Sequence, residues 1–109
     1  MAICLPLEAE ARAFMEAEAR TAMRHLQGWF LDDVDNCLRL SKVYGSDNFL
    51  QSLAIAQRVG RLAQAENHHP EIIIAWGRCT VSWWTTRIGG IHDNDVRMAA
   101  ATDELLSQP

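Results

Sequence analysis

Residues 67–76 read Asn-His-His-Pro-Glu-Ile-Ile-Ile-Ala-Trp, and the other expected elements of the chain are placed around this stretch. Pro70 biases the residue before it away from helical torsions, so a helix that approaches it should end near Asn67. The apolar run that follows Pro70 is rich in β-branched residues and predicts a strand. His68 and His69 therefore lie at a helix-to-strand junction, and imidazole is the one side chain that ordinarily titrates near neutral pH.

The segments on both sides of this junction predict a long helix followed by a hairpin. Ser46 and Asp47 are candidate N-caps, and apolar residues then recur at helical spacing. After the junction, two β-rich segments, Glu71–Trp76 and Cys79–Thr86, are separated by Gly77-Arg78, a connection of hairpin length. Because side chains alternate along a strand, one face of the second segment should point to the core. The members of that face are Cys79, Val81, Trp83 and Thr85.

The first part of the chain and its end predict two more helices and a further hairpin. Leu7–Leu26 is rich in Ala, Glu, Arg and Met and contains no internal Gly or Pro, which predicts a helix. Trp29–Leu31 and Cys37–Tyr44 are apolar stretches on either side of a polar connection, and they predict two strands. His92–Leu106 supplies apolar residues at helical spacing and predicts the closing helix.

These elements predict an α+β fold, in which a four-stranded antiparallel sheet packs against three helices in the order α-β-β-α-β-β-α. At 109 residues the chain is long enough for one hydrophobic core, so residues 1–109 are expected to form a single domain. A sheet of this kind leaves two edges, which favours pairing between subunits.

The composition excludes several classes of protein. The formal net charge is −4 and the basic residues are scattered, so direct nucleic-acid binding is not expected. No apolar run approaches the ~20 residues that a membrane helix needs, so no membrane association is expected. The cysteines are odd in number and lack CxxC spacing, which argues against a disulfide framework and a structural zinc site, and favours the reducing cytosol. A metal site at His68, His69, His92 and Cys79 is disfavoured because no pair has a recognised ligand spacing.

From about Leu26 to its end, the sequence resembles the pterin-4a-carbinolamine dehydratase family. The signature of that family is a polar or acidic residue, a His-His-Pro, a downstream aromatic residue, a further His after a strand, a Gly-containing turn and an Asp. The matching residues here are Gln64, His68-His69-Pro70, Trp76, Gly89-Gly90-Ile91 and Asp95.

The resemblance implies roles for these residues and a mode of assembly. His68 and His69 would be the catalytic acid–base residues, and Trp76 and Asp95 would shape the site. The ligand-binding residues expected on this basis are Pro70, Trp76, Trp84, Thr86 and Asp95. The family fold implies a homo-oligomer, either a dimer or a tetramer, with residues 1–25 as an N-terminal helical extension. No cofactor is expected, since a pterin would be the substrate or a ligand.

The departure from the family lies at its catalytic centre, because this sequence has Thr85-Thr86 where the family has Thr-His. Dehydration of a 4a-hydroxytetrahydropterin requires a proton for the leaving hydroxyl and withdrawal of a ring N–H proton. A threonine hydroxyl is neither an effective acid nor an effective base at pH 7, although Thr86 could hydrogen-bond a ligand or a water. His92 is the nearby substitute, but a helix N-terminus disfavours the cationic form of imidazole.

Trp83 and Trp84 are neighbours on a predicted strand, so they cannot both face the core. An outward-facing Trp84 beside Thr86 could stack on a flat pterin, anchor a protein interface, or be buried in an oligomer. These three interpretations stay open.

Two functions from different classes follow. One is a dehydratase that recycles the pterin cofactor of aromatic amino acid hydroxylases. The other is a catalytically impaired relative that acts as an assembly factor or chaperone, as the resemblance to carboxysome-associated members suggests, with the Rubisco large subunit as the implied partner. The sequence favours the second function because the missing imidazole is catalytic, whereas retention of His68 and His69 favours the enzyme.

Overall fold

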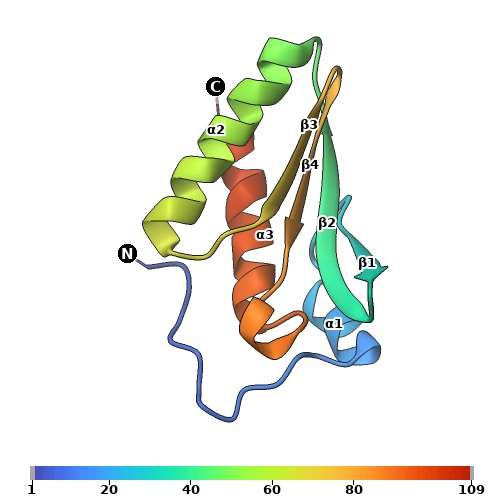
Figure 1. The fold of residues 1–109 in the computed structure, drawn as a ribbon, viewed down its shortest axis with the longest axis vertical. Helices are drawn as coiled ribbons and strands as arrows, with labels where there is room; N and C mark the ends of the chain where they lie inside the picture. Colours follow the sequence, from blue (N-terminus) through green and yellow to red (C-terminus); the bar gives the residue numbers. More distant parts are fainter. Residues whose placement is uncertain (1, 109) are drawn as a thin grey trace.

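The computed structural model describes residues 2–108 and shows an α+β fold with one sheet and helices on one of its faces (Figure 1). The predicted order of elements is confirmed. The elements are α1 (Glu16–Ala22), β1 (Phe30–Val34), β2 (Cys37–Gly45), α2 (Phe49–Glu66), β3 (Glu71–Ala75), β4 (Arg78–Trp83), the short 3-10 helix η1 (Thr86–Ile88) and α3 (Asp93–Leu106).

The sheet has the strand order β1-β2-β4-β3, and each neighbouring pair is antiparallel. Leu40 of β2 lies opposite Trp83 of β4, and Ile72 of β3 lies opposite Val81. Leu40, Val81 and Trp83 are all fully buried beneath α2 and α3. The predicted core face of the fourth strand is therefore confirmed from Cys79 to Trp83.

Residues with positive φ form the hairpin turns. Asp35 and Asn36, with φ of 52° and 63°, join β1 to β2, as a two-residue turn of this hand requires. Gly77, with φ of 80°, lies in the turn between β3 and β4. The predicted connection was wrong by one residue, because Arg78 pairs with Ala75 inside the sheet and Trp76 takes its place in the turn.

The long helix begins one residue later than predicted. Asn48, rather than Ser46 or Asp47, is the N-cap, and its side-chain oxygen accepts a hydrogen bond of 2.9 Å from the backbone N–H of Gln51. The helix ends where expected. Asn67 adopts a left-handed conformation with φ of 51°, and the N–H of His68 bonds back to the carbonyl of Ala63 at 3.1 Å.

The prediction of a helix over Leu7–Leu26 was wrong for most of its length. Only α1 is helical there, and residues 3–14, here called the strap, run in an irregular, extended path past the start of α3 (Figure 1). A short isolated helix is marginal in water even with good helix formers. The strap instead donates backbone N–H groups to Glu66 and Asn94, so contacts distant in sequence override local propensity.

Among residues 2–108, no helix combines the length and the apolar character needed to cross a membrane.

Candidate functional site

The turn at Asn67 brings His68 from the end of α2 onto the end of β4. The His68 ring is half-buried and stacks on the Trp83 indole, with centroids 5.6 Å apart and an interplanar angle of 17°. Trp83 is itself fixed by burial and by a hydrogen bond from Nε1 to the Thr102 hydroxyl at 3.2 Å. One face of the imidazole therefore rests on a rigid part of the core.

Asp95, in the first turn of α3, fixes the edge of the same ring. Its side chain is 0% exposed, and Oδ1 lies 2.6 Å from Nε2 of His68. Oδ2 accepts hydrogen bonds of 2.8 Å from the Thr85 hydroxyl and from the backbone N–H of His92. A carboxylate is favoured at a helix N-terminus, and these three partners offset the cost of burying it.

This arrangement determines which nitrogen of His68 is free. The Asp95 carboxylate can only accept, so a neutral His68 carries its proton on Nε2. Nδ1 is then left as the acceptor, available to a ligand. In this structure both Asp95 oxygens are occupied by contacts within the chain, and its predicted contact with a ligand stays a prediction.

Sequence reasoning missed Thr85 as part of the site, because its position on the strand predicted a core contact. Thr85 follows the last residue of β4 and is held by an isolated β-bridge to Gly90, with its N–H 2.8 Å from the Gly90 carbonyl. The bridge aims its hydroxyl at Asp95. The sequence did place Thr85 on the same strand face as Trp83, and the His68 ring stacks on Trp83. That shared face was the signal that could have identified Thr85 as part of the site.

His69 lies beside His68 but on the exposed side of the junction. Its Nε2 is 3.1 Å from Oε1 of Gln64, one turn back along α2, so the amide oxygen orients this ring as well. The half-buried Pro70 follows directly and starts the path into β3. The two adjacent histidines are therefore both oriented, one by a buried carboxylate and one by a surface amide.

A hollow of about 330 Å³ lies beside His68, between the strap and the ends of α2 and β4. Burial, followed by the charges of Glu66 and Asp95, raises the pKa of the Cys4 thiol in this hollow to about 11, so the thiol stays protonated at neutral pH. The lining residues are Cys4, Leu5, Pro6, Leu7, Glu66, Asn67, His68, Thr85 and Asn94.

The remaining residues predicted to bind ligand lie in three different places. Thr86 is exposed at the start of η1, next to Thr85. Trp84 is half-buried, and the Arg39 guanidinium lies 3.9 Å from the centre of its ring. Trp76 is 72% exposed in the β3–β4 turn, at the opposite end of β3 from Pro70. The structure thus brings His68 and Asp95 together. Trp76 of the same protomer lies at the far end of β3 from this pair.

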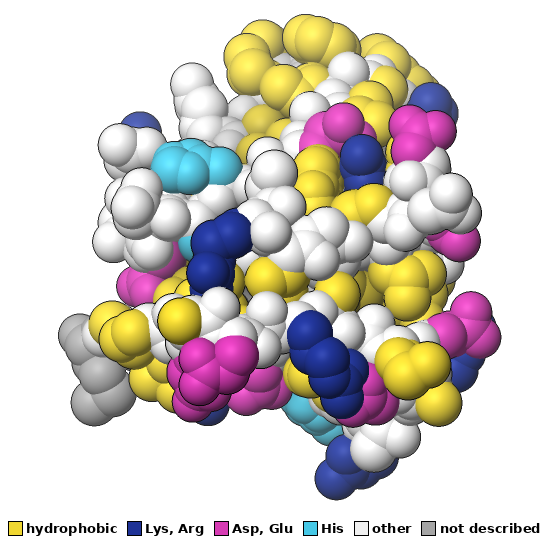
Figure 2. Space-filling model, turned by 60° about the horizontal axis from the view of Figure 1, so that its bottom comes forward, with side chains coloured by type: hydrophobic (Ala, Val, Ile, Leu, Met, Phe, Trp, Pro, Cys, Tyr) yellow, Lys and Arg dark blue, Asp and Glu magenta, His cyan; other side chains and the backbone are white. Residues whose placement is uncertain are grey.

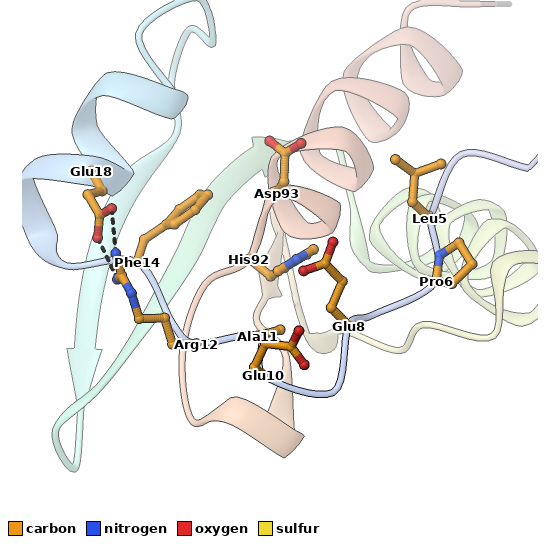
Figure 3. A pocket seen from close by; sticks show the side chains of 10 residues that line it. All are labelled: Leu5, Pro6, Glu8, Glu10, Ala11, Arg12, Phe14, Glu18, His92 and Asp93. Carbon is orange, nitrogen blue, oxygen red and sulfur yellow. Dashed lines mark hydrogen bonds and ion pairs between the residues drawn. The ribbon is translucent and has the colours of Figure 1, made fainter.

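His92 lines a second hollow, of about 420 Å³, whose other walls come mostly from the strap (Figure 3). Its Nδ1 accepts the N–H of Asn94 at 3.1 Å, so His92 is the N-cap of α3, and the Asp95 carboxylate accepts the His92 N–H in return. The ring is stacked with Phe14 at 6.5 Å. His92 therefore caps a helix and does not share the His68 hollow.

Within the part of the chain that the structure describes, no three His, Cys, Asp or Glu side chains are arranged to hold a metal ion.

Comparison with known proteins gives a family for this sequence and architecture. A family model described as Pterin 4 alpha carbinolamine dehydratase matches residues 12–105. A relative from Marinobacter nauticus, named for pterin-4-alpha-carbinolamine dehydratase, is 42% identical over 102 residues, which cover 94% of this chain and 92% of the relative. One from Chlorobaculum tepidum, named in the same way, is 42% identical over 103 residues, covering 94% and 93%.

Two solved structures share the fold. A transcriptional coactivator/pterin dehydratase from Brucella melitensis has a TM-score of 0.73 at 24% identity, over 86% of this chain and 98% of that one. A pterin dehydratase-like protein identified as a RuBisCO assembly factor in the alpha-carboxysome has a TM-score of 0.61 at 16% identity, over 78% and 96%. At these identities the likeness concerns the fold alone.

Proposed function

The chain belongs to the pterin-4a-carbinolamine dehydratase family, and we propose that it binds a 4a-hydroxytetrahydropterin and removes water from it, with His68 as the principal acid–base residue. The observation that carries this proposal is the fully buried Asp95, which holds His68 in one tautomer. A protein that used this fold only as a scaffold would have no need for such an oriented imidazole.

The chemistry assigns a task to each histidine. His68 accepts the ring N–H proton at Nδ1, the nitrogen that Asp95 leaves free. His69 supplies a proton to the leaving hydroxyl, which departs as water. Pro70 follows His69 in the chain and Thr86 follows Thr85, and we assign both of them contacts with the ligand. The pterin is the substrate in this scheme, and the scheme uses no cofactor.

Thr86 makes this a slow enzyme. Loss of one positioned acid–base group typically lowers a rate by ~10²–10⁴, because a hydroxyl cannot exchange protons at neutral pH as imidazole does. His92 does not restore the missing group, since it lines the other hollow and not the one beside His68. We therefore propose weak dehydratase activity that depends on His68.

The test is a dehydration assay with 4a-hydroxytetrahydropterin on the native chain, His68→Ala and Thr86→His. We expect a measurable native rate, its loss in His68→Ala by on the order of 10²-fold, and a gain in Thr86→His. Gln57→Ala, on the exposed surface of α2, is a control outside the site. A native rate equal to that of His68→Ala would refute catalysis by His68.

A second candidate is an assembly factor for other proteins, with the Rubisco large subunit as its partner. It is favoured by Thr86 and by large apolar side chains that are exposed away from the His68 hollow: Leu50, Ile73 and Trp76. The same assay separates the candidates. An inert native chain that becomes active in Thr86→His would mean that only the third imidazole is missing, and would direct the search to protein partners.

For either function we place the protein in the cytosol, where free thiols persist. Cys4, Cys37 and Cys79 are all unpaired with one another, as this location requires.

A further inference from the structure

The strap is attached to the body of the protein by polar contacts at both ends. Near its start, Oε1 of Glu66 accepts the N–H groups of Ile3 and Cys4 at 2.7 and 2.9 Å. Leu5 exchanges two hydrogen bonds with the side-chain amide of Asn94, at 2.9 and 2.8 Å. Farther along, the Arg87 guanidinium donates a hydrogen bond of 2.7 Å to the backbone carbonyl of Glu8. The backbone N–H of Phe14 donates one of 2.8 Å to the carbonyl of Ile91.

The strap contributes no fully buried side chain to the hydrophobic core, against which Ile3, Cys4 and Phe14 pack half-buried. Leu5 is 52% exposed, and in the described part of the chain no residue before Ala19 is buried. On the face that includes this region, acidic and basic side chains alternate around apolar ones (Figure 2). A segment held by hydrogen bonds at the surface can open locally while the core stays folded.

The position of the strap connects its attachment to the site. Leu5 and Pro6 line the hollow beside His92, which Figure 3 shows, and they also line the hollow beside His68. The strap therefore supplies part of the wall of both hollows, which measure about 330 and 420 Å³. Ligand clefts usually measure ~300–1,000 Å³, and the His68 hollow, at about 330 Å³ with the strap in place, lies at the lower end of that range.

We propose that the strap is a displaceable cover of the His68 site: docked, it closes the hollow, and released, it admits the ligand. The anchors Glu66 and Asn94 lie beside the functional residues, two positions before His68 and one before Asp95, so release of the strap frees a carboxylate and an amide at the rim of the opened cleft. The identity of the ligand rests on the proposed dehydratase function, whereas the cover itself rests on the contacts of the strap.

The first test compares Glu66→Ala with Glu104→Ala, a control at an exposed residue of α3. Loss of the carboxylate should raise hydrogen exchange at the amides of Ile3 and Cys4 by about tenfold or more, because both bonds to a charged acceptor are lost. The rate at which diethyl pyrocarbonate modifies His68 should rise several-fold in the same variant. The exposed His25 serves as the internal reference in each sample.

A second pair of variants acts on the other end of the strap without touching Glu66. A Cβ added to Gly90 would lie 2.7 Å from the Ala13 side chain, so Gly90→Ala must displace the strap there. Ala13→Gly removes the opposing atom, and the double variant restores the space. We expect His68 modification to rise in Gly90→Ala and to return toward the native rate in the double variant.

These measurements separate the cover from the function. The proposal that the strap covers His68 would be overturned if amide exchange in the strap became faster in Glu66→Ala and Gly90→Ala while modification of His68 stayed unchanged in both. Faster modification together with faster association of 7,8-dihydropterin, followed by fluorescence, would support both proposals. If modification rises but no form of the protein binds dihydropterin, the cover stands and the proposed ligand class is wrong.

Discussion

Asp103 is the residue that fastens α3 to the inner face of the sheet. Its Oδ1 accepts from Lys42 Nζ at 2.8 Å and from the Tyr44 hydroxyl at 2.6 Å, and its Oδ2 accepts from Trp29 Nε1 at 2.9 Å. Burial raises the pKa of Asp103, but these hydrogen bonds and the Lys42 charge outweigh burial and hold that pKa below its usual value. A carboxylate with a pKa lowered by folding stabilises the protein above its unfolded pKa, and this contribution is lost as pH falls through the folded value.

Asp103→Asn should therefore destabilise the protein in a pH-dependent way. We expect the free energy of unfolding at pH 7 to fall by about 1–2 kcal/mol, since a neutral amide replaces a charged acceptor. The difference from the native chain should shrink as pH falls from about 4, where the carboxylate of the unfolded chain takes up its proton, and should vanish below the lower pKa of the folded chain. Urea unfolding at pH 7 and pH 3 measures this, with Glu104→Gln as the neighbouring control. An equal difference at both pH values would show that the charge of Asp103 contributes nothing.

The end of α2 depends on one left-handed residue, Asn67, which also sets the direction of His68. Asn67→Ala should lower the free energy of unfolding by ~1 kcal/mol, because a Cβ without a polar side chain is strained at positive φ. Asn67→Gly should be close to neutral, since glycine adopts this conformation freely. Urea unfolding of both variants distinguishes conformational strain, which only the alanine variant suffers, from loss of the side chain, which both share.

The same junction shows which elements could be predicted from the sequence. The α2 end follows from Pro70, and the core face of β4 follows from strand alternation, because both signals are local. The strap could not be predicted, since its conformation depends on Glu66 and Asn94, which lie far along the chain. Asp95 was identified from the family signature, but its role as a buried support for His68 required coordinates.

The whole molecule has its helices on one side, and this leaves the opposite face of the sheet uncovered (Figure 1). The register places Val43, Thr80 and Ile73 side by side across β2, β4 and β3. Val43 and Ile73 are each about half exposed, and β3 is an edge strand whose outer backbone groups have no neighbour in the sheet. An apolar edge strand pairs readily with a second copy unless charge blocks it.

We predict that the chain is a homo-oligomer that pairs through the edge of β3, as a dimer or a tetramer of 12.3 kDa protomers. Ile73→Lys should convert it to monomers, because a charge on an edge strand opposes pairing, while the fold is kept since the side chain is exposed. Light scattering after size-exclusion chromatography gives the mass, and Gln57→Lys, on the exposed surface of α2, controls for the added charge. The β3 edge would be excluded as the contact if Ile73→Lys kept the native mass. A native chain that elutes as a monomer would refute the assembly itself, and the site would then have to function with the residues of one protomer.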